Sequence, residues 1–504
     1  MEDIWLDGES LTLDDVERVA RRGFRAALAD SAIPRMEASR AVVDRCVEER
    51  LVRYGITTGF GKFSDVVISP ENNAALQRNL IMSHACGVGD PFPQEVVRAM
   101  LLLRANALAV GVSGARVSTV KALLDLLNTG VVPVIPEKGS LGSSGDLAPL
   151  AHMALVLCGM GEAFWCGERM AGGEALKRAG LSPVELSAKE GLALINGTQA
   201  MTAVAALACS DAARAVRLAD ALAALSHQAL RGITDAYDGR IHELRRQDGQ
   251  VASAAALRDL LAGSGLTTRQ GEERVQDAYA LRCVPQVHGA SRDAVNYVEG
   301  VVSRELNAAT DNPLIFPDGS GYGDILSGGN FHGQPVALAM DFLAIALAEL
   351  ANISERRTER LVNPALSNGL PAFLVKEGGV NSGFMILQYV AAALVSENKI
   401  LAHPASVDSI PSSANQEDHV SMGTIAARKA RSVLGNLQHV LAIELLAACQ
   451  AVDLLGGTDR LSPATRRLYD ALRAEVPFMD RDRVLYPDIE KARVLVADWV
   501  DRGQ

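Results

Sequence analysis

The loop Gly139-Ser-Leu-Gly-Ser-Ser-Gly-Asp146 contains residues whose types and spacing allow a chemical change of the backbone itself. Glycine has no side chain, so the Gly145 nitrogen could approach the Ser143 carbonyl far more closely than ordinary packing permits. Loss of one water would then close a five-membered imidazolinone ring. Loss of a second water from Ser144 would leave an exocyclic methylene, a strong electrophile that none of the twenty side chains supplies.

The same loop has two simpler interpretations, a phosphate-binding loop and a flexible turn. Gly139, Gly142 and Gly145 form a Gly-x-x-Gly-x-x-Gly pattern before a helix, as some phosphate-binding loops do. The loop lacks the Gly-Lys-Ser/Thr ending of a P-loop, and Lys138 precedes it instead. The apolar residues that follow recur at helical spacing, which predicts a helix over about 147–158. The N-terminus of that helix would favour negative charge on a ring carbonyl.

Five segments, in order along the chain, resemble the aromatic amino acid ammonia-lyases. They are Tyr54-Gly-Ile-Thr-Thr-Gly-Phe-Gly-Lys62, the loop with its continuation to His152, Glu190-Gly-Leu-Ala-Leu-Ile-Asn-Gly-Thr-Gln199, Gln276-Asp-Ala-Tyr-Ala-Leu-Arg282 and Asn415-Gln-Glu-Asp-His419. The similarity covers nearly the whole chain and points to the branch that acts on histidine. It implies elimination of ammonia from L-histidine to give trans-urocanate, the first step of histidine degradation.

The resemblance also implies a prosthetic group, 4-methylideneimidazol-5-one (MIO), that forms from Ser143, Ser144 and Gly145 beside Asp146. No external cofactor and no metal would then be required. The family usually has alanine where this chain has Ser143. We expect this side chain to project from the ring without taking part in closure.

The elimination must remove a β-hydrogen that is barely acidic and expel an amine that is a poor leaving group. The resemblance makes Tyr54 the base, and because tyrosine normally titrates near 10, its surroundings must lower its pKa. Whether the substrate amine or the substrate ring attacks the methylene stays open. The further catalytic candidates are Tyr279 and Glu417, and the substrate-binding candidates are His84, Asn196, Gln276, Arg282, Phe331 and Gln416.

Several of these side chains suit the substrate chemically. Arg282 offers a planar pair of donors to a carboxylate, and one helical turn would place Tyr279 on the same face. Asn196 could bond the carboxylate or the ring carbonyl. His84 and Glu417 can partner the two imidazole nitrogens, since an unpaired nitrogen in a closed pocket costs roughly 1–3 kcal/mol. Phe331 would pack against the prosthetic ring, and Gln276 and Gln416 would add polar contacts.

Four other functions have to be compared with this one. Relatives that move the amine to the β-carbon use the same prosthetic group, and a binding protein could keep the fold without activity. Helical fumarase-type lyases use a Gly-Ser-Ser-x-Met-Pro loop, whereas Gly142-Ser-Ser-Gly145 continues here into Asp-Leu-Ala. The nine histidines show no His-Glu-x-x-His pattern, which disfavours a metal hydrolase.

The elements that must position these residues are mostly helices. Start signals and apolar spacing predict helices over 13–28, 69–83 and 93–111, long buried helices over 335–361, 384–401 and 423–455, and a β-hairpin over 163–172. We expect a mainly α, elongated subunit with a central bundle of long helices, similar to the aspartase/fumarase architecture. Residues 1–504 would form one subunit, in which 1–200 carry the loop and 201–504 supply the bundle and C-terminal helices.

Composition favours a soluble intracellular enzyme, and the resemblance implies a small-molecule amino acid as its substrate. The 504 residues carry a net charge of −11, which argues against nucleic acid or an anionic membrane as a partner. Seven cysteines without Cys-x-x-Cys pairs fit a reducing compartment. The acidic N-terminus is unlike a signal peptide, and charges such as Asp341 interrupt the apolar runs before ~20 residues. We expect a cytoplasmic protein, and the resemblance implies a homotetramer whose sites draw residues from more than one subunit.

Overall fold

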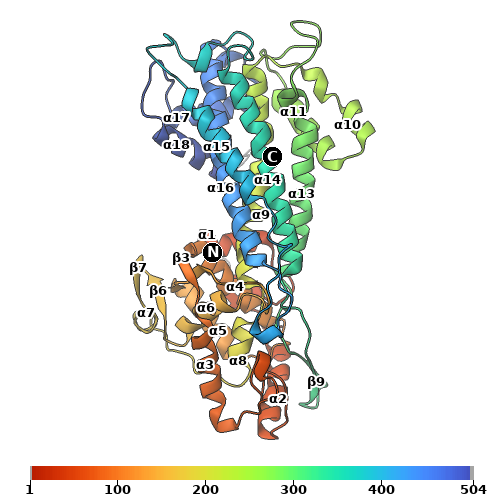
Figure 1. Ribbon diagram of the computed structural model, residues 1–504, viewed down its shortest axis with the longest axis vertical. Coiled ribbons are helices and arrows are strands. Elements are labelled where there is room, and N and C mark those ends of the chain that lie inside the picture. The colour runs from red at the N-terminus through yellow and green to blue at the C-terminus, as the bar shows by residue number, and fades with distance from the viewer. Residues whose placement is uncertain (1–2, 500–504) are drawn as a thin grey trace. The chain divides into compact units, whose positions relative to one another are not determined.

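The computed structural model describes residues 3–499, and helices dominate them (Figure 1). The predicted mainly helical fold is confirmed. Contacts divide the chain into two compact units. The first comprises the chain up to Ser210, Glu299–Asp341 and Pro404–Arg428, and the second comprises Asp211–Val298, Phe342–His403 and the chain from Lys429 on. The single subunit over residues 1–504 stays a prediction.

The first unit combines short strands with helices of moderate length. Its helices are α1 (Leu13–Arg22), α2 (Ile33–Glu48), α3 (Asn73–His84), α4 (Gln94–Ala109), α5 (Val117–Thr129), α6 (Leu147–Leu157), α7 (Gly172–Arg178) and α8 (Glu190–Ile195). Its strands are β1 (Ile4–Leu6), β2 (Ala26–Leu28), β3 (Val88–Pro91), β4 (Val132–Pro133), β5 (Pro136–Lys138), β6 (Glu162–Trp165), β7 (Glu168–Ala171), β8 (Leu314–Pro317) and β9 (Gly323–Leu326). Strands β6 and β7 pair antiparallel, so the predicted hairpin is confirmed.

The predicted first helix is correct at its start and wrong at its end. Thr12 forms a capping box with Asp15 and begins α1. The helix stops at Arg22 because Gly23 adopts a left-handed backbone, with φ of 71°. The chain then forms β2, parallel to β1, where the helix was expected to continue. The predicted helices after Pro70 and Pro93 are confirmed as the 3₁₀ turn Pro70–Asn72 with α3, and as α4.

The second unit contains α10 (Gly239–Arg245), α11 (Asp248–Leu261), α12 (Tyr279–Arg282), α15 (Met385–Leu401), α17 (Pro463–Glu475) and α18 (Tyr486–Asp498). Four long helices have residues in both units: α9 (Gln199–Ala229), α13 (Val284–Glu305), α14 (Gln334–Val362) and α16 (Gly423–Leu454). The three long helices expected near 335–361, 384–401 and 423–455 are thus confirmed as α14, α15 and α16 to within one residue at each end.

A buried polar network joins the helices of the second unit. The Arg357 guanidinium on α14 donates to both oxygens of Glu444 on α16, at 2.6 and 2.9 Å, and both side chains are fully buried. Ser226 on α9 and Ser354 on α14 also donate to Glu444. Because every carboxylate oxygen has partners, the charge of Glu444 is compensated in the apolar interior.

We expect Glu444→Gln to destabilise the protein by about 3–5 kcal/mol, because it leaves the buried Arg357 charge without its counter-ion. The urea midpoint and Tm, each compared with wild type, measure this loss. Asp470→Asn is the matched control, since it removes the exposed Arg466–Asp470 pair, for which we expect a change of at most about 1 kcal/mol. Equal effects of the two substitutions would contradict the prediction.

Two helices of the described chain, α14 and α16, are long and apolar enough to cross a membrane by length and composition. Asp341 therefore does not interrupt the first apolar run as completely as expected. In the structure, 61% and 72% of these apolar windows are buried inside the protein, as in core helices of soluble proteins.

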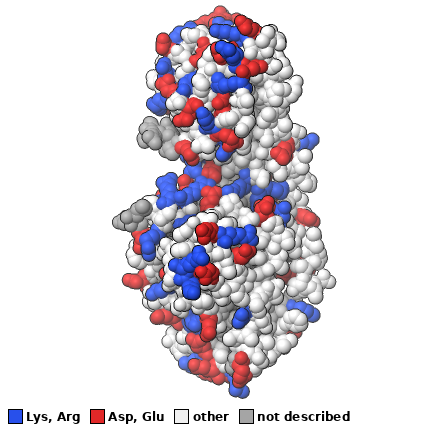
Figure 2. Space-filling view, turned by 90° about the vertical axis from the view of Figure 1, so that its left-hand side faces the viewer, with Lys and Arg blue, Asp and Glu red and all other residues white. Residues whose placement is uncertain are grey.

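On the face drawn in Figure 2, basic and acidic side chains are interspersed.

Candidate active site

The loop over residues 139–146 has a backbone conformation that favours glycine at two positions. Gly142 and Gly145 adopt left-handed conformations, with φ of 66° and 71°. A methyl group on Gly145 would overlap the Gly197 carbonyl oxygen, and one on Gly142 would overlap the Ser421 hydroxyl. At both positions, therefore, a side chain would collide with a neighbouring segment of the first unit.

Asp146 ties the end of this loop into the core of the first unit. Its carboxylate is fully buried and accepts hydrogen bonds from the Ser140 hydroxyl at 2.8 Å, the Met201 N–H at 2.8 Å and the Thr424 hydroxyl. Burial raises the pKa of Asp146, while these three donors lower it. Its own N–H donates to Gly197 O at 2.7 Å, so side chain and backbone both fix the residue after the triad.

Asn196, the residue after α8, points its side-chain amide at the loop. Its Nδ2 donates to the Ser144 carbonyl oxygen at 2.9 Å. Fully buried Arg104 on α4 donates to Asn196 O at 3.0 Å and to Gln199 Oε1 at 2.7 Å; burial lowers the pKa of Arg104 to about 10. Two partners were expected for Asn196, the substrate carboxylate and the ring carbonyl. In the structure its amide contacts the Ser144 carbonyl oxygen, which would become the ring carbonyl oxygen on cyclisation.

Tyr54 lies half-buried in the first unit, where the Gly61 N–H donates to its hydroxyl at 3.4 Å. Burial raises the pKa of Tyr54, the Gly61 N–H lowers it, and the carboxylates of Glu417 and Asp311 raise it further. The expected lowering of the pKa is therefore not found within this unit. The physical reason is that burial, and to a smaller extent the nearby negative charges, disfavours a phenolate.

Glu417 and Ser143 are 274 residues apart in the chain and are hydrogen-bonded in the structure. The Ser143 hydroxyl donates to Glu417 Oε2 at 2.9 Å, and the Ser412 hydroxyl donates to the same oxygen at 3.2 Å. The side chain that distinguishes this loop from the usual alanine thus contacts a predicted substrate-binding residue.

The turn before Glu417 has an unusual backbone. Ser413, Ala414 and Asn415 all adopt left-handed φ values, between 51° and 66°, a conformation that side chains disfavour. Ser412 and Glu417 exchange backbone hydrogen bonds across this turn, at 2.9 and 3.3 Å. Together these contacts aim the Glu417 carboxylate at the loop.

His84, the last residue of α3, has a defined orientation. Its Nδ1 lies 2.8 Å from Leu80 O, an acceptor, so we assign the proton to Nδ1. Nε2 is then the nitrogen with a free lone pair. Burial lowers the pKa of His84, while the Leu80 carbonyl and Glu417 raise it. The neutral imidazole therefore offers an acceptor to a ligand.

Two adjoining cavities in the first unit bring most of the predicted residues together. One, of about 710 Å³, is lined by Tyr54, His84, Ser144 and Glu417. The other, of about 510 Å³, shares Tyr54, Ser144 and Glu417 with the first and adds Ser143, Asn196, Phe331 and Gln416. Residues from five separate stretches of sequence thus surround Ser144.

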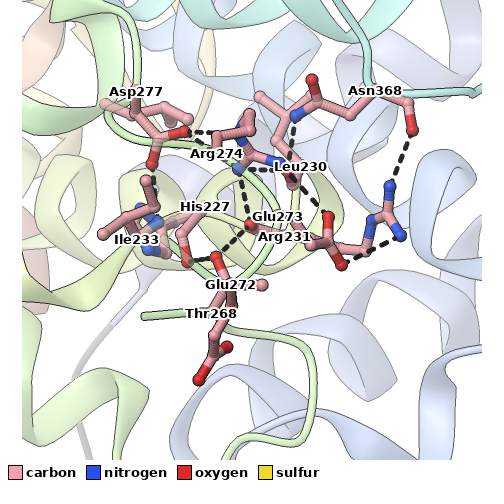
Figure 3. Close-up of polar contacts among 12 residues, drawn as sticks. His227, Leu230, Arg231, Ile233, Thr268, Glu272, Glu273, Arg274, Asp277 and Asn368 are labelled. Carbon is pink, nitrogen blue, oxygen red and sulfur yellow. Dashed lines mark hydrogen bonds and ion pairs between the residues drawn. The ribbon is translucent and has the colours of Figure 1, made fainter. Parts of the chain in front are cut away.

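Gln276, Tyr279 and Arg282 lie in the second unit. The predicted helical turn is α12, and the Arg282 guanidinium lies 4.7 Å from the centre of the Tyr279 ring. This segment is anchored through Asp277, which accepts hydrogen bonds from the Ile233 N–H and from Arg274, as Figure 3 shows. The roles of these three residues stay predictions.

Comparison with known proteins places the chain in a family. A sequence profile described as aromatic amino acid lyase matches residues 11–474. A histidine ammonia-lyase of Caldanaerobacter subterraneus subsp. tengcongensis is 62% identical over 489 residues, which cover 97% of this chain and 95% of the relative. The chain belongs to the aromatic amino acid lyase family.

Solved structures resemble this lyase over nearly its whole length. Histidine ammonia-lyase from Trypanosoma cruzi has a TM-score of 0.91 at 47% identity, covering 98% of this chain and 93% of that one. Tyrosine aminomutase from Streptomyces globisporus has a TM-score of 0.94 at 40% identity, covering 98% and 97%. Relatives that eliminate ammonia and relatives that transfer the amine therefore share this fold.

Four residues that hold the loop, or the end of α8 beside it, belong to none of the predicted site residues: Arg104, Met201, Ser421 and Thr424. Arg104 could have been noticed as the basic residue inside the uninterrupted buried stretch over residues 99–109 of α4. Met201 and Thr424 have ordinary types at ordinary helical positions, and Ser421 lies just before α16, so no local pattern marks these three residues. Among residues 3–499 no three His, Cys, Asp or Glu side chains cluster as metal ligands.

Proposed function

We propose that this lyase is a histidine ammonia-lyase, which eliminates ammonia from L-histidine and releases trans-urocanate. The observation that supports this most directly is the meeting of His84, Glu417 and Ser144 around one cavity. Near-full-length identity of 62% to a protein named histidine ammonia-lyase adds support. We expect the protein to act in the cytoplasm, in histidine degradation, without an external cofactor.

We propose that Ser143, Ser144 and Gly145 form MIO in this chain. When present, the group supplies an electrophilic methylene that activates the substrate through its amine or its ring. Asn196 already donates to the Ser144 carbonyl oxygen, so it can stabilise negative charge that develops there. Phe331 lines the adjoining cavity with Ser143 and Ser144, where its ring can exclude water.

We assign recognition of the imidazole to His84 and Glu417. The lone pair of His84 Nε2 accepts from one substrate nitrogen, and the Glu417 carboxylate accepts from the other nitrogen when that nitrogen is protonated. A phenyl ring would offer a hydrogen bond to neither group, so the His84 Nε2 lone pair would lack a donor and Glu417 would keep only the Ser143 and Ser412 hydroxyls. Each polar group left unsatisfied in a closed cavity costs roughly 1–3 kcal/mol. Gln416, on the same cavity wall as Ser143, would add a polar contact.

We assign removal of the β-hydrogen to Tyr54, and binding of the substrate carboxylate to Arg282 with Tyr279 and Gln276. The chain would act as a homotetramer in which each site draws residues from more than one subunit. Apolar side chains exposed on α14 and α15, among them Ile345, Ile386 and Tyr389, support such an interface. A cationic Arg282 brought near Tyr54 would supply the lowering of its pKa that the first unit lacks.

The contact between Ser143 and Glu417 has a measurable consequence. We expect Ser143→Ala to raise the KM for L-histidine about fivefold, since one hydrogen bond of about 1 kcal/mol that orients the Glu417 carboxylate is lost, with little change in kcat. In a Glu417→Gln background the same substitution should add little, because the pair is already disrupted. Equal effects in both backgrounds would show that Ser143 acts independently of Glu417.

The amine-transferring activity is the second candidate, favoured by the structural similarity to tyrosine aminomutase. Purified protein incubated separately with L-histidine, L-tyrosine and L-phenylalanine distinguishes the functions. Ammonia and an α,β-unsaturated acid formed from L-histidine alone support the proposal, and a β-amino acid product supports the mutase. No product, together with no near-ultraviolet absorbance of a conjugated ring, would indicate an inactive scaffold.

A further inference from the structure

The residues at the start of α16 bond to the loop on both sides of the triad over residues 143–145. Before the triad, the Met422 N–H donates to Leu141 O at 2.8 Å, and the Ser421 hydroxyl donates to Gly142 O at 3.0 Å. After the triad, the Thr424 hydroxyl donates to Asp146 Oδ1. These three donors are buried, so water does not compete for the loop.

The opposite side of the loop rests on the turn at the end of α8. Gly145 and Gly197 form a parallel β-bridge, and the Asp146 N–H donates to Gly197 O at 2.7 Å. Asn196 holds the Ser144 carbonyl oxygen. The three residues of the triad are therefore suspended between anchors on two separate elements, α16 and the end of α8.

The chemistry of ring closure depends on such anchors. The Gly145 nitrogen adds to the Ser143 carbonyl carbon. The Ser143 carbonyl oxygen then leaves as water, together with the amide protons of Gly145 and Ser144. A C=N bond between the Ser143 carbon and the Ser144 nitrogen results. The Ser144 hydroxyl then leaves as a second water with the Ser144 α-hydrogen, which forms the methylene. No electrons are gained or lost, so the step needs alignment but no co-reactant.

We infer that Ser421 and Thr424 are positioning residues for ring closure, which they promote by fixing the two flanks of the triad. The inference rests on the proposed function, because it presumes that MIO forms. When both flanks are fixed, the conformation in which the Gly145 nitrogen lies near the Ser143 carbonyl carbon is populated more often, and ring closure is faster. Ser421 is 279 residues from Gly142, so closure requires the tertiary fold and not the loop sequence alone.

The test follows the intact mass of newly made chains with time. Wild type, Ser421→Ala, Thr424→Val and Thr424→Ser are produced by cell-free translation. Samples are quenched at intervals, and the intact mass of the chain is measured by mass spectrometry. Thr202→Val is the matched control, because the buried Thr202 hydroxyl donates to the carbonyl of Thr198, the residue before α9, and not to the loop. Circular dichroism of each purified variant checks that it is folded.

We expect wild type, Thr202→Val and Thr424→Ser to become two waters lighter at similar rates. Ser421→Ala and Thr424→Val should lose the waters roughly fivefold more slowly each, the effect of about 1 kcal/mol per lost hydrogen bond. Near-ultraviolet absorbance should rise with the same delay. Folded Ser421→Ala and Thr424→Val chains that close at the wild-type rate would overturn the inference alone, whereas a wild-type chain that loses no water would contradict the proposed prosthetic group itself.

Discussion

Ser144→Ala should abolish turnover of L-histidine, with a loss in kcat on the order of 10⁴-fold or more, as when a covalent catalyst is removed. Alanine has no hydroxyl to leave as the second water, so no methylene can form even if the ring closes. The side chain contacts no other predicted catalytic group through a hydrogen bond that the structure describes, and the fold should survive. Production of ammonia and the ultraviolet absorbance of urocanate measure the loss.

Ser143→Ala is the matched control for this substitution. Its hydroxyl takes no part in closure, so the variant should keep most of the wild-type kcat. Intact mass separates the two variants independently of activity: Ser143→Ala should be two waters lighter than its translated chain, and Ser144→Ala at most one. Full activity of Ser144→Ala would refute the mechanism.

Tyr54→Phe should reduce kcat by roughly 10²–10⁴-fold, the contribution of a general base, because phenylalanine cannot accept the β-hydrogen. The pH profile carries a second signature. A base must be deprotonated, and burial raises the pKa of Tyr54. Wild-type kcat/KM should therefore rise with pH up to the pKa of Tyr54 in the free enzyme, and fall as pH drops below it.

The alkaline rise should be missing from the profile of Tyr54→Phe. Tyr322→Phe is the control, since the Tyr322 hydroxyl donates to Glu49 on the surface of the same unit, at 2.9 Å, and lines neither cavity. It should keep both the rate and the profile. A Tyr54→Phe variant that retains the alkaline limb would assign the titration to another group.

Much of the fold could be predicted from local patterns in the sequence. Helices α14, α15 and α16 were predicted because apolar residues fill most of their faces, and the helices after Pro70 and Pro93 because proline favours the first turn. The end of α1 was missed because Gly23 could equally lie within a helix or end it. Pairing of β2 with β1 decides the matter, and that contact is not local.

The candidate site divides in the same way. Motifs identified Tyr54, Asn196 and Glu417, the chemistry of imidazole recognition added His84, and the structure brings all four around Ser144. The direction of the pKa shift of Tyr54 was not predictable, because it depends on burial and on carboxylates that are distant in sequence. Ser421 and Thr424 escaped notice for a related reason, since a hydroxyl near a helix start has many ordinary uses.

The dependence of the loop on α16 also bears on fragments of the chain. A polypeptide released by the ribosome before residue 421 lacks the serine and threonine that hold residues 141–146. Such a fragment would lack the contacts that fix both flanks of the triad, so its ring closure should be slower than in the full chain. The electrophile, with its reactivity toward thiols and amines, should then form mainly in chains whose synthesis is nearly complete.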